Sequence, residues 1–291
     1  MPKLAVLGQP IAHSRSPAMH TAALGALGLA EEWTYEAIEV APDDFDSRVR
    51  SMPRGGFVGA NVTVPHKLRA LAIADSASPA AREIGAANTL SFTERGIEAD
   101  NTDASGLIAA LPVSPGGKRA LVLGAGGAAR ACVWALAGSG AEVSVWNRTR
   151  ARAEALASEL DASVADLGGR PLEPSTYDLL VNATSVGLAS ASASASEPGD
   201  PLPDLKTLCL DADSVEARHV VVDLVYGSAE TPLSMFARER GATVVDGLEV
   251  LVHQGAASLR LWTGLDPPLD VMRATARSDT IRWQQTSAPD T

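Results

Sequence analysis

The 291-residue sequence is poor in cysteine, aromatic residues and lysine, and it has no long apolar run. Its two cysteines, Cys132 and Cys209, exclude a disulfide framework, and neither has a histidine or cysteine at metal-ligand spacing, so we expect no metal site. Aromatic residues make up 4% of the chain, which disfavours a stacking surface for single-stranded nucleic acid. No apolar run reaches the roughly 18 residues that a membrane span needs.

Charge and length narrow the class of protein further. A net charge of −11 argues against a nucleic-acid or anionic-membrane partner and leaves a small molecule as the expected one. The chain enters a predicted strand at residues 4–8 without the pattern of a secretory signal peptide, so we expect a cytoplasmic protein. A length of 291 residues fits one large or two ordinary domains.

What the chain does contain is a glycine-rich turn between a predicted strand and a predicted helix. Residues 120–123 are apolar, Gly124, Gly126 and Gly127 follow, and residues 128–136 form an alanine-rich helical pattern. This order is the context of a dinucleotide-binding fingerprint, with Ala129 in the third glycine position. The first glycine permits the turn, Gly126 allows close approach of a pyrophosphate, and the helix N-terminus attracts the anion. The alternative is an ordinary strand that ends in a glycine turn.

The residues about twenty positions later indicate which dinucleotide is bound. A strand at 142–146 ends in Asn147-Arg148-Thr149, where the residue that reads the ribose is expected. A carboxylate there would favour NAD, whereas Arg148 can meet a 2′-phosphate with a planar fork of donors and Thr149 can add a hydroxyl. The sequence therefore favours NADP. The alternative for Arg148 is a surface arginine that opens a helix.

Alternating strand and helix patterns predict an α/β fold with mostly parallel sheets. Before a Pro/Gly linker at 112–117, we expect strands at 4–8, 33–40, 56–64, 89–93 and 96–99, the last two forming a hairpin around Glu94-Arg95. We expect helices at 17–27, 42–52, 80–85 and 104–111, besides a short helix from Pro65. Ser16 is expected to cap the helix at 17–27, and residues 100–103 the helix at 104–111.

The linker is the expected domain boundary. After it, we expect strands at 120–123, 142–146, 179–183, 220–224 and 243–245 and helices at 128–136, 151–160, 232–240 and 247–263. The Ala/Ser tract at 189–196 is expected to be a flexible surface loop, and Pro267-Pro268 to end the regular fold ahead of a tail.

Small polar residues gather where the first predicted strands end, which is where ligands bind in open α/β sheets. They suit a small polyhydroxylated ligand, although each alone could be a helix cap, strand filler or turn residue. These residues are Ser14, Ser16, Asn61, Thr63, Asn88 and Asp103. Lys67 follows the strand at 56–64, and it is one of only four lysines in the chain. Unlike arginine, a lysine can lose its proton, so Lys67 with Asp103 is a candidate acid–base pair, the alternative being a solvated helix residue.

Nine motifs together resemble the shikimate dehydrogenases of the shikimate/quinate dehydrogenase superfamily, over about residues 4–265. They are residues 8–17 (GQPIAHSRSP), 61–67 (NVTVPHK), 85–89 (GAANT), 101–103 (NTD), 124–128 (GAGGA), 147–149 (NRT), 182–187 (NATSVG), 246–248 (DGL) and 253–255 (HQG). The resemblance implies NADPH-dependent, reversible reduction of 3-dehydroshikimate to shikimate in aromatic amino-acid biosynthesis. It also implies a substrate domain and a Rossmann-type NADP domain on either side of a cleft.

The resemblance implies catalytic, substrate-binding and NADP-binding roles for the residues at the matching positions. Lys67 and Asp103 would be catalytic. Substrate would be held by Lys67 and Asp103 and by Ser14, Ser16, Asn61, Thr63, Asn88, Tyr226 and Gln254. NADP would be held by Gly124, Ala125, Gly126, Gly127, Ala128, Asn147, Arg148, Thr149, Thr184, Ser185, Leu224 and Gly247. The expected domains are 1–104, completed by a helix within 247–275 that packs back, then 105–246, with 276–291 as a tail; the protein would be a monomer or homodimer.

One departure from the family and two rival functions remain open. Family members often carry methionine near the nicotinamide, where this chain has Glu249 and Val250. Serine at both positions 14 and 16 resembles shikimate-specific members more than quinate users. The nearest rivals are a quinate or aminoshikimate dehydrogenase, and the rival of another class is a non-catalytic NADP-binding regulator.

Overall fold

The first hundred residues build a six-stranded sheet. The computed structural model describes residues 1–168, 170–188, 202–227 and 229–278. The order of the first sheet is β2-β1-β3-β5-β6-β4. Its strands are β1 (Lys3–Gly8), β2 (Thr34–Glu39), β3 (Phe57–Val62), β4 (Ser76–Ala77), β5 (Thr89–Thr93) and β6 (Gly96–Asp100). β1 is parallel to β2 and β3, and β5 is antiparallel to β3 and β6, which confirms the predicted hairpin.

A second six-stranded sheet follows the Pro/Gly linker, and all of its strands are parallel. Its strands are β7 (Arg119–Leu123), β8 (Glu142–Trp146), β9 (Ser163–Val164), β10 (Leu179–Asn182), β11 (Val220–Asp223) and β12 (Thr243–Asp246). They lie in the order β12-β11-β10-β7-β8-β9. This arrangement places β7 at the centre, as in the Rossmann fold, whose ligand crevice lies at the carboxyl ends of the central strands. The predicted fold class is confirmed.

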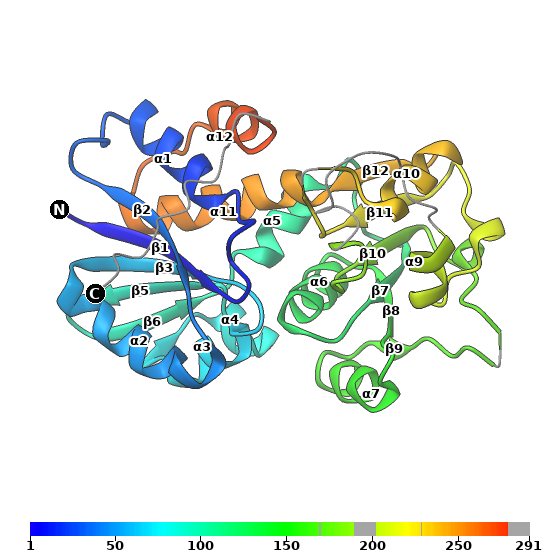
Figure 1. Ribbon diagram of the computed structural model, residues 1–291. Coiled ribbons are helices and arrows are strands. Elements are labelled where there is room, and N and C mark those ends of the chain that lie inside the picture. The colour runs from blue at the N-terminus through cyan, green and yellow to red at the C-terminus, as the bar shows by residue number, and fades with distance from the viewer. Residues whose placement is uncertain (169, 189–201, 228, 279–291) are drawn as a thin grey trace, which may run out of the picture.

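Helices cover both faces of each sheet (Figure 1). Around the first sheet lie α1 (Ser16–Ala26), α2 (Phe45–Ser51), α3 (Lys67–Ile73), α4 (Pro79–Ile84) and α5 (Asp103–Ala110), with short 3₁₀ turns at Pro42–Asp44 and Met52–Gly55. Around the second lie α6 (Gly127–Gly138), α7 (Arg150–Glu159), α9 (Leu202–Thr207) and α10 (Pro232–Glu239), with 3₁₀ turns at Pro174–Thr176 and Ala212–Ser214.

The last two helices return to the first sheet. Figure 1 shows α11 (Gly247–Thr263) extending from the end of β12 towards the first sheet, with α12 (Leu269–Ala276) beside α1. They complete a core on one face of the first sheet, in which Leu251 and Met272 pack with Leu4, Met19 and Leu24. The other face has a separate core under α2 and α3.

The end of the fold differs from the sequence prediction. Pro267-Pro268 does not end the regular structure, because Pro268 precedes the eight-residue helix α12. Only Met272 and Ala276 of that helix are fully buried, and two apolar residues four positions apart are too weak a pattern to predict a helix. The Ala/Ser tract at 189–196 and residues 279–291 of the predicted tail lie outside the described residues.

The starts of three helices also differ from the sequence prediction. Ser16 is the first residue of α1 and not its N-cap, which is Arg15. α5 begins at Asp103, and the side-chain oxygen of Asn101 accepts from the backbone N–H groups of Asp103 and Ala104 at 3.1 and 3.4 Å. The helix predicted at 42–52 is a 3₁₀ turn followed by α2.

In the described ranges, no helix combines the length and the apolar character needed to cross a membrane. The same ranges contain no group of three or more histidine, cysteine, aspartate or glutamate side chains arranged to hold a metal ion.

Candidate active site

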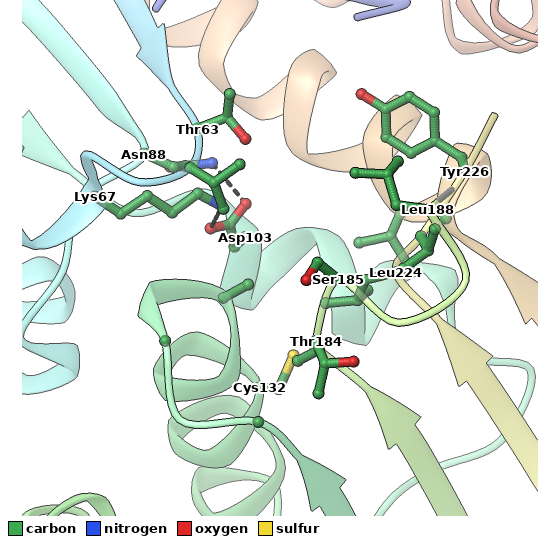
Figure 2. Close-up of a pocket in the computed structure, with 18 of the residues that line it drawn as sticks. Thr63, Lys67, Asn88, Asp103, Cys132, Thr184, Ser185, Leu188, Leu224 and Tyr226 are labelled. Atoms are coloured by element: carbon green, nitrogen blue, oxygen red, sulfur yellow. Dashed lines mark hydrogen bonds and ion pairs between the residues drawn. The ribbon is translucent and has the colours of Figure 1, made fainter. Parts of the chain in front are cut away.

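A cavity of about 520 Å³ lies between the two sheets, at the carboxyl ends of their central strands. Figure 2 shows Lys67, Asn88 and Asp103 on one side of it and Thr184, Ser185 and Leu224 on the other. Of the predicted substrate residues, the lining contains Ser14, Ser16, Asn61, Thr63, Lys67, Asn88, Asp103, Tyr226 and Gln254. Of the predicted cofactor residues, it contains Gly124, Ala125, Gly126, Ala128, Asn147, Arg148, Thr184, Ser185, Leu224 and Gly247. Gly127 and Thr149 do not line it.

Lys67 and Asp103 form an ion pair in the cavity wall. Each is the first residue of a short helix, α3 and α5, so both side chains start from a strand-to-helix turn. Lys67 Nζ lies 2.6 Å from Asp103 Oδ2, and the two side chains are 13% and 15% exposed. The preceding residue, His66, is buried with its ring stacked on Phe45, so it is a packing residue. The pair is therefore shielded from bulk water but open to a ligand.

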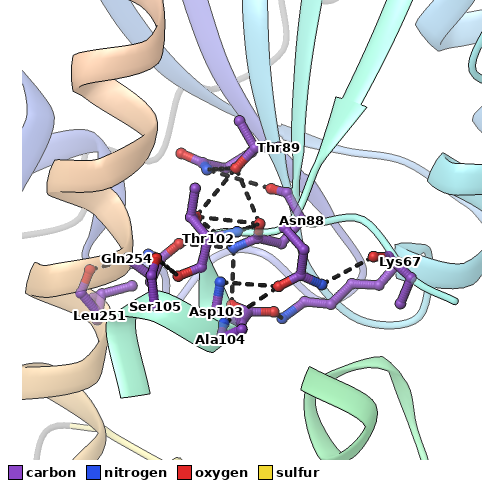
Figure 3. A network of polar contacts seen from close by, with 12 residues as sticks. Lys67, Asn88, Thr89, Thr102, Asp103, Ala104, Ser105, Leu251 and Gln254 are labelled. Atoms are coloured by element: carbon purple, nitrogen blue, oxygen red, sulfur yellow. Dashed lines mark hydrogen bonds and ion pairs between the residues drawn. The ribbon is translucent and has the colours of Figure 1, made fainter. Parts of the chain in front are cut away.

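Asn88 connects this ion pair to the last long helix (Figure 3). Its amide nitrogen lies 2.8 Å from Asp103 Oδ1, 3.0 Å from Thr102 Oγ1 and 3.0 Å from Gln254 Oε1. An amide nitrogen carries two hydrogens, so these three acceptors cannot all be served at once. Two of these acceptors, on Asp103 and Gln254, belong to residues that line the cavity, whereas Thr102 is buried outside it.

Two phenols, the buried Tyr35 and the half-buried Tyr226, lie beside the polar residues of the first sheet, and Tyr35 was not predicted from the sequence. The Tyr35 hydroxyl donates to Asn61 Oδ1 at 2.8 Å, and Ser258 donates to the same oxygen at 3.3 Å. Tyr226 bonds the Ser14 side chain, and burial raises the pKa of its phenol. Tyr35 lies on an edge strand whose alternation gives no sign of a polar role, so only its place in the fold reveals it.

Backbone atoms of the glycine turn after β7 form part of the cavity wall. Gly124 has φ of +117°, and a methyl group there would lie 2.9 Å from the Ala183 carbonyl oxygen, so only glycine fits. Beside Gly126 there is open space, with no atom within 4 Å of a methyl group placed there. The N–H groups at the start of α6 follow directly.

A buried carboxylate, also not predicted, holds the two loops on the far side of the turn. Asp223 Oδ1 accepts from Asn182 Nδ2 at 2.9 Å and from the Val225 backbone at 3.1 Å, while Oδ2 accepts from Thr231 at 2.5 Å. Asn182 in turn accepts from the Thr184 backbone and hydroxyl. Burial raises the pKa of Asp223 to about 6. This network fixes the cavity-lining segments after β10 and β11.

Arg148 follows β8 and is exposed, and in the described part of the chain it has no acidic partner. Its neighbour Arg150 differs, because it pairs with Glu154 at 2.8 Å and Asp166 at 3.3 Å. Arg148 is thus the cation at this strand end that is available to an anionic ligand.

Glu249 and Val250, which stand at the start of α11 where family members often carry methionine, have different surroundings. Glu249 is absent from the cavity lining and pairs with Arg273 at 2.8 Å and Arg277 at 3.3 Å, which binds α12 to α11. Val250 lines the cavity. Only the valine can change the surface that a ligand meets.

Comparison with known proteins gives the same family along most of the chain. Family models match over three stretches: the shikimate dehydrogenase substrate binding domain over residues 6–90, shikimate/quinate 5-dehydrogenase over 110–210, and the shikimate 5′-dehydrogenase C-terminal domain over 247–277. A shikimate dehydrogenase (NADP(+)) of Thermus thermophilus is 45% identical over 280 residues, which cover 95% of this chain and 98% of the relative. That of Acidiphilium cryptum is 41% identical, with 91% of each chain covered.

Solved structures agree. A shikimate 5-dehydrogenase of Thermus thermophilus in complex with NADP(H) and shikimate has a TM-score of 0.82 and 42% identity, with 95% of this chain and 99% of the other covered. A 5-ketofructose reductase of Gluconobacter has a TM-score of 0.77 and 30% identity, with 94% and 97% covered, so this fold accommodates more than one substrate. Because these two curated relatives match more than nine-tenths of the sequence at over 40% identity, the chain belongs to the shikimate dehydrogenase family.

Proposed function

We propose that the protein catalyses the reversible, NADPH-dependent reduction of 3-dehydroshikimate to shikimate in aromatic amino-acid biosynthesis. The observation that carries the proposal is the Lys67–Asp103 ion pair, which lies in the same cavity as the open turn of the Rossmann sheet. A relative of known structure contains both NADP(H) and shikimate.

The residues around the second sheet fit NADP. The space beside Gly126 leaves room for a diphosphate at the N-terminus of α6, and the exposed Arg148 suits a 2′-phosphate. When bound, NADPH supplies the hydride for the ketone carbon. The residues that we assign to holding it are Gly124, Ala125, Gly126, Ala128, Asn147, Arg148 and Thr149, with Thr184, Ser185, Leu224 and Gly247 beside them; Gly127, which does not line the cavity, is not assigned to it.

Lys67 supplies the proton. Its ammonium group donates to the ketone oxygen as that oxygen gains negative charge, and the neutral amine takes the proton back in the reverse direction. Asp103 holds the amine in place through the 2.6 Å contact and accepts from a neighbouring substrate hydroxyl. Asn88, which lines the same cavity and bonds Asp103, is assigned to another substrate hydroxyl. Ser14, Ser16, Asn61, Thr63, Tyr226 and Gln254 complete the set that we assign to the substrate's carboxylate and hydroxyls.

The lysine is tested by replacing it and an exposed lysine in parallel. Lys67→Ala should lower kcat by roughly 10²–10⁴, the usual contribution of acid–base catalysis, with little change in shikimate binding. Lys206→Ala is the control, because Lys206 is exposed and does not line the cavity. Absorbance of NADPH at 340 nm measures both. An unchanged kcat in Lys67→Ala would remove the lysine from this role.

Substrate choice is tested on the unmodified protein. We expect kcat/KM to be highest for shikimate with NADP when shikimate, quinate and aminoshikimate are each offered with NADP and with NAD. A higher value for quinate or aminoshikimate would reassign the substrate. No turnover of any of them, with NADP still bound, would make the protein a cofactor-binding regulator.

We also infer a division of labour along the chain. Residues 1–104 with the helices in 247–275 form the substrate-binding and catalytic unit, and residues 105–246 form the NADP-binding unit. The two separate sheets and the return of α11 to the first of them support this division.

A further inference from the structure

Of the three glycines in the turn, Gly127 is the one that does not line the cavity. A Cβ atom added to it would point at Lys67. A methyl group placed on Gly127 would lie 2.7 Å from Lys67 Cβ, 3.2 Å from Cδ and 3.4 Å from Cγ. Carbon atoms of different side chains normally stay about 3.5–4.0 Å apart. The first residue of α6 therefore lies flat against the aliphatic stem of Lys67, at a separation that only glycine allows.

The three glycines of this turn have three different surroundings. Gly124 needs its positive φ and its closeness to the Ala183 carbonyl, and Gly126 borders open space in the cavity. Gly127 has no positive φ, so its backbone conformation does not require glycine. The contact with Lys67 is what excludes a larger residue there.

This contact restrains the part of Lys67 that lies between its two hydrogen-bonded ends. The amine is held by Asp103, and the backbone carbonyl accepts from the Ala87 N–H at 2.9 Å. Between these ends lies the flexible aliphatic stem, whose conformational freedom must be restricted for the amine to hold one position. α6 belongs to the second sheet and α3 to the first, so the stem is restrained by the cofactor-binding part of the fold.

We propose that Gly127 is a positioning residue for Lys67, which fixes the distance between the proton donor and the cofactor-binding turn. The proposal rests on the proposed function, in which Lys67 donates the proton. It separates two tasks within one motif: Gly126 makes room for the cofactor, and Gly127 makes room for the lysine.

Three alanine variants test it. Gly127→Ala should lower kcat by roughly 10-fold to 100-fold, the scale of a misplacement of about 1 Å, with the Kd for NADPH, measured by its fluorescence, little changed from that of the unmodified protein. Gly126→Ala should do the opposite and weaken NADPH binding most. Gly138→Ala is the matched control, because Gly138 ends the same helix, is exposed and has no atom within 4 Å of an added methyl. It should leave both values unchanged.

A double variant distinguishes positioning from general damage. If Gly127 acts through Lys67, adding Gly127→Ala to Lys67→Ala should lower kcat no further. An equal loss in both backgrounds would overturn the proposal, as would a normal kcat in Gly127→Ala. A Gly127→Ala protein that does not fold, or that loses NADPH binding together with turnover, would assign the glycine to helix packing or cofactor binding instead. Absence of shikimate oxidation in the unmodified protein would refute the proposed function, not the contact.

Discussion

The buried carboxylate of Asp223 should make the stability of the protein depend on pH in a defined window. Its pKa is raised by burial from 3.8 to about 6, although Thr231, Val225 and Asn182 all donate to it. Between about pH 4 and pH 6 the unfolded chain has lost this proton while the folded protein keeps it. Stability therefore falls as pH rises through this window, and above about pH 6 the folded protein bears the whole cost of a buried charge.

The size of the effect follows from the shift. A change of about two pKa units at about 1.36 kcal/mol per unit corresponds to about 3 kcal/mol of unfolding free energy. Asp223→Asn has the same shape and no charge to bury. Relative to the unmodified protein, the variant should therefore gain about 3 kcal/mol in unfolding free energy between about pH 4 and pH 7, on top of a constant offset from altered hydrogen bonds.

Urea unfolding followed by circular dichroism at several pH values measures this difference. Asp213→Asn is the control, because that carboxylate is 93% exposed and makes only a surface ion pair with Arg240. Its difference from the unmodified protein should change little with pH. A constant difference between the unmodified protein and Asp223→Asn across the window would refute the reasoning that Asp223 is charged and buried at neutral pH.

Three further predictions concern the cofactor, the core and the thiols. Arg148→Ala should raise KM for NADP far more than KM for NAD. Arg150→Ala is the control and should change neither KM, because Arg150 is already paired with Glu154 and Asp166. Equal effects of Arg148→Ala on both cofactors would exclude a phosphate contact. Gly106→Ala should lower the unfolding free energy by about 1–3 kcal/mol, because the methyl would lie 2.8 Å from backbone of α11, and unchanged thermal unfolding would contradict that overpacking. Burial raises the pKa of the Cys132 thiol to about 12. In mildly alkaline buffer a disulfide reagent should therefore modify Cys209 first. Rapid reaction of both thiols would show that Cys132 is not buried.

The parts of the fold that local patterns determine could be predicted from the sequence. The turn after β7 combines an apolar strand, closely spaced glycines and an alanine-rich helix in one short stretch, so its form did not depend on distant contacts. The hairpin around Glu94-Arg95 is equally local. α12 was missed because its helical stability comes from packing Met272 and Ala276 on α1, a contact between opposite ends of the chain.

The site could be predicted as a set of residues but not as an arrangement. Polar residues at strand ends and a rare lysine indicated which side chains would gather, because the carboxyl ends of parallel strands meet at one edge. The support of Asn61 by Tyr35 joins residues 26 positions apart. The packing of Gly127 on the Lys67 stem joins two sheets, so no spacing along the chain could reveal it.

The return of the last helices to the first sheet has a consequence for the order in which the protein can mature. Leu4, Met19 and Leu24 are covered by Leu251 and Met272, which are synthesised more than 200 residues later. Chains are made from the N-terminus at about 5–20 residues per second, so this apolar face waits uncovered for roughly ten seconds or more. The Rossmann sheet, which carries its own core, can form meanwhile. The domain whose synthesis begins first therefore completes its core only after α11 and α12 are made. A nascent chain stalled before residue 247 would expose the apolar face of this incomplete domain to chaperones.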